Sequence, residues 1–517
     1  MTANRTAQLA ELLRELPALR VEGDLSVNIR GIVDDSRLVQ PGDIFVALRG
    51  QQFDGHRYIH DALAKGAAVL VCQDWPAVDV GQSTVVQVED SHKALGHLAS
   101  AFYGHPSRQL RLIGVTGTDG KTSTTFLAAE ILRAAGNRVG HCTTVEVHDG
   151  RSARPNEVGF TTPQAMDLQR LLRDMVDAQA QAAVVEVSSH ALATGRVEGC
   201  EFDMAVFTNL APEHLDFHLT LEEYRRQKMR LFAALGGPRT KSWEPVGVIN
   251  ADDPSAPYFA ASCTTPWDYG IEHPARVRAR EVTLTPRGSR FLLETPEGVT
   301  PIETHLLGRF NVRNWLAATA AALACGARPE HVIAAARQVR PFPGRMEPLD
   351  AGQPFSLYVD FAHTPQGLTA ALDTLRELHQ GKTIAVFGHA GGRDTSHRRG
   401  LVEVARSRRS DGQARCDLFI LTMDDPHLED PAAILEEMRA AALDMGCREG
   451  EDFLSVPDRR EAFAEAFRRA KPGDAVLLAG RGHERTIPLG SQKMPFHDAT
   501  VARELLGTGR EGPKRLG

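Results

Sequence analysis

Short apolar runs alternate with amphipathic helical stretches along most of the chain. The runs that we predict as strands are 67–72, 111–116, 183–187, 204–207, 355–359, 383–387, 417–421 and 475–479. Strands separated by helices usually pair in parallel, so the pattern predicts an α/β fold. Ligands of such sheets bind at the carboxyl ends of the strands. The Gly-, Asp- and His-rich loops that follow the last four runs therefore indicate a binding site.

The chain divides into three blocks. Its length of 517 residues corresponds to about three domains of roughly 150 residues. We expect a small mixed α/β domain over 1–106, a central P-loop ATPase domain with a parallel sheet over 107–339, and a Rossmann-like domain over 340–517. Residues 2–20 predict an amphipathic helix, because Leu9, Leu12, Leu13 and Leu16 fall on one face.

Composition narrows the function classes. The chain has 59 Lys and Arg against 66 Asp and Glu, a net charge of −7 that argues against a nucleic-acid partner. No apolar run approaches the ~18 residues of a membrane span, and the first residues resemble neither a signal peptide nor a lipidation motif. The seven cysteines form no CxxC pair, so neither a disulfide framework nor a zinc site is predicted. We expect a monomer in the reducing cytoplasm, without membrane insertion.

A glycine-rich loop gives the sharpest chemical signal. Residues 114–125 read GVTGTDGKTSTT and stand between a predicted strand and a predicted helix, as a variant of the Walker loop. Gly117 and Gly120 can adopt positive φ and turn backbone amides toward phosphates. Lys121 brings positive charge to the terminal phosphates, and Thr122 offers a hydroxyl to Mg²⁺. The pattern favours a nucleotide site over a purely structural glycine turn.

Polar residues follow the next two predicted strands. Glu186 closes an apolar run, and Asn209 and His214 lie in the segment TNLAPEHLDFH after the next run. A carboxylate beside a phosphate loop is suited to bind a metal ion. The alternative for Glu186 is a solvated or helix-capping carboxylate, and a single histidine in such a loop is more often structural. Together, Glu186 and His214 favour a role in the site.

Lys228 lies on an apolar helix face. Thr220 and Glu223 form a capping box that predicts a helix start. The positions that share one face of this helix are Leu221, Tyr224, Lys228, Leu231 and Leu235. Two interpretations stay open. The lysine can extend its amine to solvent, or burial can lower its pKa, so that the neutral amine reacts with CO₂ to give a metal-binding carbamate.

Several segments resemble the Mur ligase family, which forms peptide bonds on a UDP-muramoyl precursor at the expense of ATP. They are GTDGKTS, EVSSHAL, TNLAPEHLDFH, QKMRLF, LLGRFNVRNWLAA, FPGRME and DFAHTP, in the family's order between about residues 30 and 500. DDSRLVQPGDIFVALRG, FDGH, FTTP, EVSSHAL with Arg196, and AGRGHE resemble the branch that adds the third amino acid to UDP-N-acetylmuramoyl-L-alanyl-D-glutamate.

The resemblance implies ATP as cosubstrate, two Mg²⁺ ions and a set of site residues. Lys121, Glu186, His214 and Lys228 would be catalytic. Those implied to bind ATP are Gly117, Thr118, Asp119, Gly120, Lys121, Thr122, Ser123, Asn311, Arg345, Asp360 and His363. Those implied to hold the UDP-sugar dipeptide are Ser36, Thr161, Thr162, Ser188 and Arg196. Those implied to receive the amino acid are Arg393, Asp425, His427, Gly480 and Glu484. The metal ligands would be Thr122, Glu186, His214 and Lys228, the last as N6-carboxylysine.

One departure bears on the incoming amino acid. Family members that add meso-diaminopimelate typically carry DNPR where this chain has DDPH, 424–427. The arginine of DNPR can pair bidentately with the distal carboxylate, whereas His427 is a weaker, pH-dependent substitute. Asp425 replaces a neutral amide with a charge that repels a carboxylate and suits an ammonium. We therefore predict L-lysine or L-ornithine, with diaminopimelate as the alternative.

Three other functions compete with this one. A folylpolyglutamate-synthase-like ligase should lack the DSR and FDGH segments of the first block, which are present. A non-catalytic Mur-like subunit or amide-transfer partner is expected to lose Lys228 or the Asp360–His363 pair, and the chain keeps them. A generic P-loop ATPase or GTPase would not combine Glu186 with His214 and Lys228.

Overall fold

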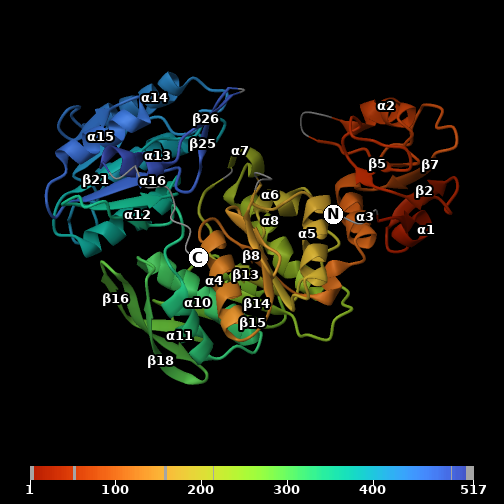
Figure 1. Cartoon of the computed structure of the whole chain (residues 1–517), viewed down its shortest axis with the longest axis horizontal. Helices are drawn as coiled ribbons and strands as arrows, with labels where there is room; N and C mark the ends of the chain where they lie inside the picture. The colour runs from red at the N-terminus through yellow and green to blue at the C-terminus, as the bar shows by residue number, and fades with distance from the viewer. Residues whose placement is uncertain (1–4, 51–53, 157–159, 214, 491, 508–517) are drawn as a thin grey trace.

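The computed structural model describes residues 5–50, 54–156, 160–213, 215–490 and 492–507. Its three main sheets lie in three lobes, with the N-terminal lobe (red) at one end of the molecule and the C-terminal lobe (blue) at the other (Figure 1). These sheets span residues 18–88, 111–304 and 347–479, which agrees with the expected α/β class. The domain limits at 106/107 and 339/340 remain our proposal.

The N-terminal sheet has five strands in the order β2-β7-β6-β5-β4, parallel except for β2. The strands of this lobe are β1 Ala7–Gln8, β2 Ala18–Glu22, β3 Asn28–Ile29, β4 Ile32–Val33, β5 Ile44–Val46, β6 Val69–Cys72 and β7 Thr84–Val88. Its helices are α1 Leu9–Leu12, η1 Gly55–Tyr58, α2 Ile59–Ala64 and α3 Ser91–Phe102.

The helix predicted over 2–20 is wrong except for the single turn of α1, Leu9–Leu12. Residues 2–4 lie outside the described part, and only α1 is helical. Pro17 has no backbone N–H to continue a helix, and the chain after it forms β2, which pairs with β7. The leucine face is nevertheless buried at Leu9, Leu12 and Leu16, because it packs in the core of this lobe.

The central sheet has eleven strands in the order β11-β10-β9-β12-β8-β13-β14-β15-β16-β17-β18. Strands β9 to β16 of that order pair in parallel, and both edges continue as antiparallel strands. The strands are β8 Arg111–Thr116, β9 Val139–Cys142, β10 Glu146–His148, β11 Ala153–Pro155, β12 Ala182–Glu186, β13 Met204–Phe207, β14 Val246–Asn250, β15 Pro266–Gly270, β16 Val277–Thr285, β17 Gly288–Thr295 and β18 Gly298–Thr304.

Helices cover both faces of this sheet. Ile113 of β8 packs in one core cluster and Leu112 in another, because successive side chains of a strand point to opposite faces. The helices are η2 Pro106–Gln109, α4 Lys121–Ala134, α5 Ala165–Asp177, α6 Ser189–Ala193, α7 Leu215–His218, α8 Leu221–Ala233, η3 Ala234–Gly236, α9 Ala256–Ala260, α10 Arg309–Ala324 and α11 Pro329–Gln338. Burial on both faces explains why the central strands are continuous apolar runs.

The C-terminal sheet has six strands in the order β19-β20-β24-β21-β22-β23, parallel except for β19. The strands of this lobe are β19 Glu347–Leu349, β20 Ser356–Asp360, β21 Thr383–Phe387, β22 Leu418–Leu421, β23 Phe453–Ser455, β24 Ala475–Ala479, and the hairpin β25 Thr486–Leu489 with β26 Gln492–Pro495. The helices are α12 Pro365–Leu378, α13 Ser396–Arg406, α14 Pro431–Asp444, α15 Arg459–Arg469 and α16 Asp498–Leu505. In the described part of the chain, no helix is both long enough and apolar enough to cross a bilayer.

Candidate functional site

The phosphate loop connects β8 to α4. Gly117 has φ 149° and Gly120 has φ 84°. A Cβ atom at Gly117 would lie 1.8 Å from the Thr208 hydroxyl, and one at Gly120 would lie 2.4 Å from the Asn314 side-chain oxygen. Both positions therefore require glycine. The loop leads into the first turn of α4, whose free amides form an anion-binding site.

Lys121, the first residue of α4, folds back over this loop. Its Nζ donates hydrogen bonds to the carbonyl oxygens of Gly117 (3.0 Å) and Thr118 (2.7 Å). This places the ammonium beside the loop amides, where a bound phosphate would lie. The motif and its geometry thus agree on an anion site at the N-terminus of α4.

Glu186 ends β12, the strand beside β8, and its side chain is fully buried. Its oxygens accept hydrogen bonds from the Thr144 amide (3.0 Å) and the Thr144 hydroxyl (3.1 Å). Burial raises the pKa of this carboxyl, and the charge of Lys121 opposes the rise.

The donor set around Glu186 fits Mg²⁺. This ion prefers oxygen donors and usually takes one or two carboxylates together with substrate phosphates and water. Glu186 and the Thr122 hydroxyl, which both line the same cavity, supply such donors. The described residues contain no group of three or more His, Cys, Asp or Glu able to hold a metal by themselves. The third expected ligand, His214, lies outside the described residues.

Lys228 is buried rather than exposed. Its side chain on α8 is 1% accessible, and Nζ donates a hydrogen bond to the Gly117 carbonyl at 2.7 Å. The amine also lies 4.2 Å from the centre of the Tyr224 ring. Burial, reinforced by the charge of Lys121, lowers the pKa of Lys228 well below its usual value. Of the two interpretations left open by the sequence, the structure excludes the solvent-exposed lysine.

Two cavities meet at the phosphate loop. The first has a volume of about 280 Å³ and the second of about 370 Å³. The walls that they share are formed by Asp119, Gly120, Ser123, Arg345 and Phe361. Expected site residues that line the first cavity are Thr118, Asp119, Gly120, Lys121, Thr122, Ser123, Thr161, Glu186, Ser188, Arg345, His363, Arg393, Asp425, Gly480 and Glu484. The two cavities therefore border the same residues of the phosphate loop.

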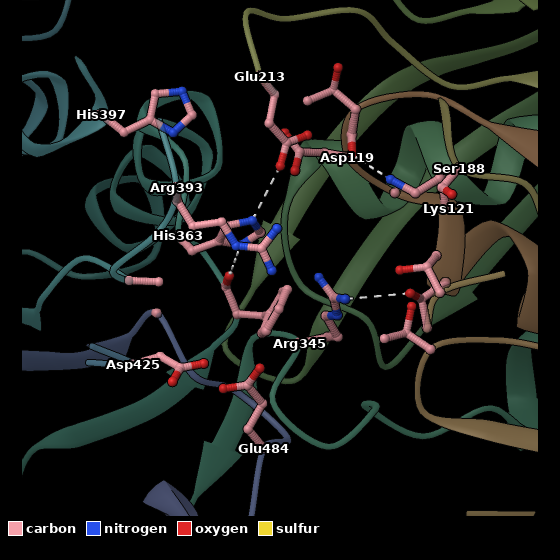
Figure 2. A pocket seen from close by; sticks show the side chains of 18 of the residues that line it. Asp119, Lys121, Ser188, Glu213, Arg345, His363, Arg393, His397, Asp425 and Glu484 are labelled. Carbon is pink, nitrogen blue, oxygen red and sulfur yellow. Dashed lines mark hydrogen bonds and ion pairs between the residues drawn. The ribbon is translucent and has the colours of Figure 1, made fainter. Parts of the chain in front are cut away.

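The C-terminal lobe supplies the charged end of the first cavity. Figure 2 shows Asp425 and Glu484 on one side of the cavity, with Lys121 and Ser188 on the other. Burial raises the pKa of Glu484 to about 7 and also raises that of Asp425. His427 is not among the lining residues. It has φ 52°, and its Nε2 lies 3.4 Å from Asp425 Oδ2.

Contacts between the central and C-terminal lobes at the cavity include those of His363 and Arg345. His363 Nε2 lies 3.3 Å from Glu213 Oε1 (Figure 2). Burial lowers the pKa of His363, whereas the hydrogen bond to Glu213 and the charge of Glu213 raise it. The second effect is larger, so the pKa of His363 is raised. Arg345 Nη2 donates a hydrogen bond of 3.4 Å to the Thr122 hydroxyl oxygen.

Asp360 anchors the segment that carries Arg345. Its carboxylate accepts hydrogen bonds from the amides of Met346 (2.6 Å) and Ala362 (2.8 Å), and burial raises its pKa to about 6. Asp360 lines the second cavity, not the first.

The residues expected at the UDP-sugar dipeptide are only partly brought together. Thr161 and Ser188 line the first cavity. Thr162 is buried behind them and donates a hydrogen bond to the Glu186 carbonyl at 2.8 Å. Arg196 donates to the Thr162 carbonyl at 3.1 Å. Ser36 follows β4 in the N-terminal lobe and lines neither cavity.

Several lining residues were not predicted individually from the sequence. One is Glu213, which precedes the expected ligand His214. His389 and His397 lie in and after the GHAGGRD loop that follows β21. The sequence signal that could have identified these residues is their position just after a predicted strand.

Asn311 is a different case, since its side chain lines neither cavity. It donates to the Leu307 carbonyl at 2.8 Å and accepts from Asn314 at 3.1 Å. Asn314, three residues further along α10, lines the second cavity. Asn311 therefore supports the lining asparagine.

Comparisons with known proteins agree on one family along the whole chain. Three family models match in order: "Mur ligase family, catalytic domain" at residues 28–103, "Mur ligase middle domain" at 115–322 and "Mur ligase, glutamate ligase domain" at 344–482. The UDP-N-acetylmuramyl-tripeptide synthetase of Roseiflexus sp. (strain RS-1) is 44% identical, covering 96% of this chain and 98% of its own. The UDP-N-acetylmuramoyl-L-alanyl-D-glutamate--2,6-diaminopimelate ligase of Geobacillus kaustophilus (strain HTA426) is 42% identical, with the same coverage.

Solved structures show the same architecture. A UDP-N-acetylmuramoyl-L-alanyl-D-glutamate--2,6-diaminopimelate ligase superposes with a TM-score of 0.67 at 29% identity, covering 98% of this chain and 100% of that one. Folylpolyglutamate synthase from Mycobacterium tuberculosis has a TM-score of 0.62 at 18% identity and covers 82% of this chain, a likeness of fold alone. The chain belongs to the Mur ligase family of ATP-dependent acid–amino-acid ligases.

Proposed function

We propose that the protein adds the third, diamino amino acid to UDP-N-acetylmuramoyl-L-alanyl-D-glutamate during synthesis of the peptidoglycan precursor. The observation that carries this proposal is the first cavity. It joins the phosphate loop and Glu186 of the central lobe to the charged residues Arg393, Asp425 and Glu484 of the C-terminal lobe. The names of the full-length relatives, all tripeptide synthetases or diaminopimelate ligases, support it.

The two cavities would bind different parts of the substrates. ATP would lie along the phosphate loop, with its adenosine in the second cavity near Asn314 and Asp360 and its γ-phosphate in the first. The D-glutamate carboxylate would reach the same place from the side of Thr161 and Ser188. The amine would enter from the side of Glu484. Because the lining residues come from different lobes, the proposed binding would bring carboxylate and amine together.

The reaction follows from the chemistry of a carboxylate. Its leaving group is oxide, so the carboxylate must first take the γ-phosphoryl group of ATP to become an acyl phosphate. Lys121 neutralises charge on the transferring group. Mg²⁺, which Glu186, Thr122 and His214 would hold, neutralises the phosphate charge when bound. ADP leaves in this transfer. The free amine then attacks the activated carbonyl, the C–N bond forms as the C–O bond to the phosphate breaks, and inorganic phosphate and one amine proton are released.

Lys228 would act as a carbamate. Burial lowers the pKa of the Lys228 amine well below its usual value and so favours the neutral form, and a neutral amine adds to CO₂ with loss of one proton to give N6-carboxylysine. The carbamate would place an anion beside Lys121, where the two charges attract, and would offer oxygen ligands to a second Mg²⁺. The modification is part of the proposal.

The charges at the end of the cavity favour a basic diamino acid without a second carboxylate, namely L-lysine or L-ornithine. Asp425 and Glu484 suit ammonium groups, and the Oδ1 atom of Asp425 is buried without a hydrogen-bond partner. The names of most relatives favour meso-diaminopimelate instead. We further propose that the enzyme acts as a monomer in the cytoplasm.

The decisive experiment is phosphate release from ATP with UDP-N-acetylmuramoyl-L-alanyl-D-glutamate, offering L-lysine, L-ornithine and meso-diaminopimelate one at a time. We expect release that depends on the nucleotide sugar and on L-lysine or L-ornithine. Activity with diaminopimelate alone would keep the ligase assignment and reverse the choice of amino acid. Release with none of the three would contradict the proposed function.

A further inference from the structure

Arg481 is a fully buried guanidinium directly behind the amino-acid end of the first cavity. It follows β24 and does not line the cavity itself. Its Nη2 lies 3.1 Å from Glu484 Oε2, and its Nη1 lies 3.5 Å from Asp424 Oδ1. Both carboxylates line the cavity. A buried charge is tolerated only when it is paired, so Arg481 and these two carboxylates hold one another in position.

Arg481 also joins two loops that the sheet order keeps apart. Asp424 follows β22 and Glu484 follows β24, while β21 lies between these strands. Arg481 donates hydrogen bonds to the carbonyl oxygens of Asp424 (3.3 Å) and Thr486 (2.5 Å). One side chain thus holds the loop after β22, the loop after β24 and the start of β25.

Two glycines make room for this arrangement. A Cβ at Gly388, after β21, would lie 2.2 Å from the Thr422 carbonyl, and one at Gly480 would lie 2.1 Å from Asp424 Oδ2. Asp424 therefore crosses the end of β21 and packs against β24 only because both positions lack a side chain. The local backbone is shaped to bring Asp424 to Arg481.

We propose that Arg481 is a positioning residue for the incoming amino acid, holding the carboxylates of Asp424 and Glu484 toward its amine groups. This rests on the function proposed above. Asp424, Asp425 and Glu484 line this end of the cavity together with Arg393, and the negative charge of the two carboxylates that Arg481 holds can bind an ammonium. Arg481 orients that charge without touching the substrate.

The same geometry predicts a pH dependence. Glu484 binds an amine as the carboxylate, and burial raises its pKa to about 7, with Arg481 opposing the rise and Asp424 and Asp425 adding to it. The positive charge of His363 also opposes it. The kcat/KM for the amino acid should therefore fall as the pH decreases through about 7. Loss of Arg481 should move this fall to higher pH.

The test compares Arg481→Gln and Arg481→Lys with the wild type, using whichever of L-lysine, L-ornithine and meso-diaminopimelate the wild type turns over. We expect Arg481→Gln to raise the KM for the amino acid about tenfold, with the KM for ATP within about twofold. We expect Arg481→Lys, which keeps the charge but not the two-pronged guanidinium, to raise the KM for the amino acid by a smaller factor. Arg376→Gln is the matched control, since Arg376 is a buried arginine of the same lobe that pairs with Asp417 away from the cavity.

A double-mutant cycle with Glu484→Gln separates positioning from general stability. If Arg481 acts through Glu484, the two substitutions together raise the KM by less than the product of their separate effects. Independent effects, or an equal rise in the KM for ATP, would overturn the inference. Should Arg481→Gln not fold, Arg481→Lys decides alone: a changed amino-acid KM or pH profile at constant ATP KM supports the inference, and equal changes in both KM values overturn it. A wild type inactive with all three amino acids would overturn the proposed function as well.

Discussion

Lys228 shows how a single side chain can be misjudged from its chemistry alone. A lysine on an apolar helix face usually reaches solvent, yet here the amine lies under the phosphate loop and is bonded to the Gly117 carbonyl. Nothing in α8 itself dictates this burial. It arises because α8 packs beneath β8 and β13, so that the face carrying Lys228 points at the loop between β8 and α4.

The carbamate proposal predicts that Lys228→Ala lowers ligase activity by about 100-fold, and that acetate or formate restores part of it by supplying the missing carboxylate. Lys241→Ala is the control, because Lys241 is also buried but binds Asp203 and the Ser107 carbonyl away from both cavities. The measurement is the steady-state rate of each variant with and without acetate or formate. Full activity of Lys228→Ala without added acid would exclude a carboxylated lysine from the mechanism.

At the scale of elements, the turn between β8 and α4 depends on glycine. Gly117→Ala would place Cβ 1.8 Å from the Thr208 hydroxyl, so the loop must shift its amides away from the phosphates. We expect the KM for ATP to rise about tenfold or more. Gly136→Ala, after α4, is the matched control, since Gly136 has φ 87° but no atom within 4 Å of an added Cβ. It should lose only about 1–2 kcal/mol of stability, measured by urea unfolding, with unchanged KM. Equal KM values in the two variants would contradict this role of Gly117.

The elements differ in how far the sequence predicts them. The strands over 111–116, 204–207, 383–387 and 475–479 are confirmed to the residue, because strands buried on both faces are uninterrupted apolar runs. The helix predicted over 2–20 is wrong because periodicity alone cannot weigh Pro17 or the pairing of β2 with β7.

The site residues, like the elements, differ in how far the sequence predicts them. Motif residues such as Lys121 and Glu484 do line the first cavity, because each follows a strand whose end the pattern locates. Glu213 and Asn314 were not predicted, since their importance comes from contacts between segments distant in sequence. No local pattern encodes that His363 of one lobe meets Glu213 of another.

Under the proposed function the reacting groups bind to separate lobes of the molecule, so catalysis would require these lobes to stay together. The His363–Glu213 contact is one of the bonds that hold them at the cavity (Figure 2). Removing it should let the C-terminal lobe move away while each lobe keeps its own sheet and core. The proximity of carboxylate and amine would be lost before the fold is.

We therefore expect His363→Ala to lower kcat about tenfold or more and to increase the radius of gyration of the substrate-free protein in small-angle X-ray scattering. ATP and the nucleotide sugar should restore part of the compactness, because they bridge the same lobes. His379→Ala is the control, since His379 bonds to Tyr358 within the C-terminal lobe and should change neither quantity. A compact His363→Ala variant with a reduced kcat would show that His363 acts on the substrates directly, whereas an expanded variant with normal kcat would show that this contact does not limit the reaction.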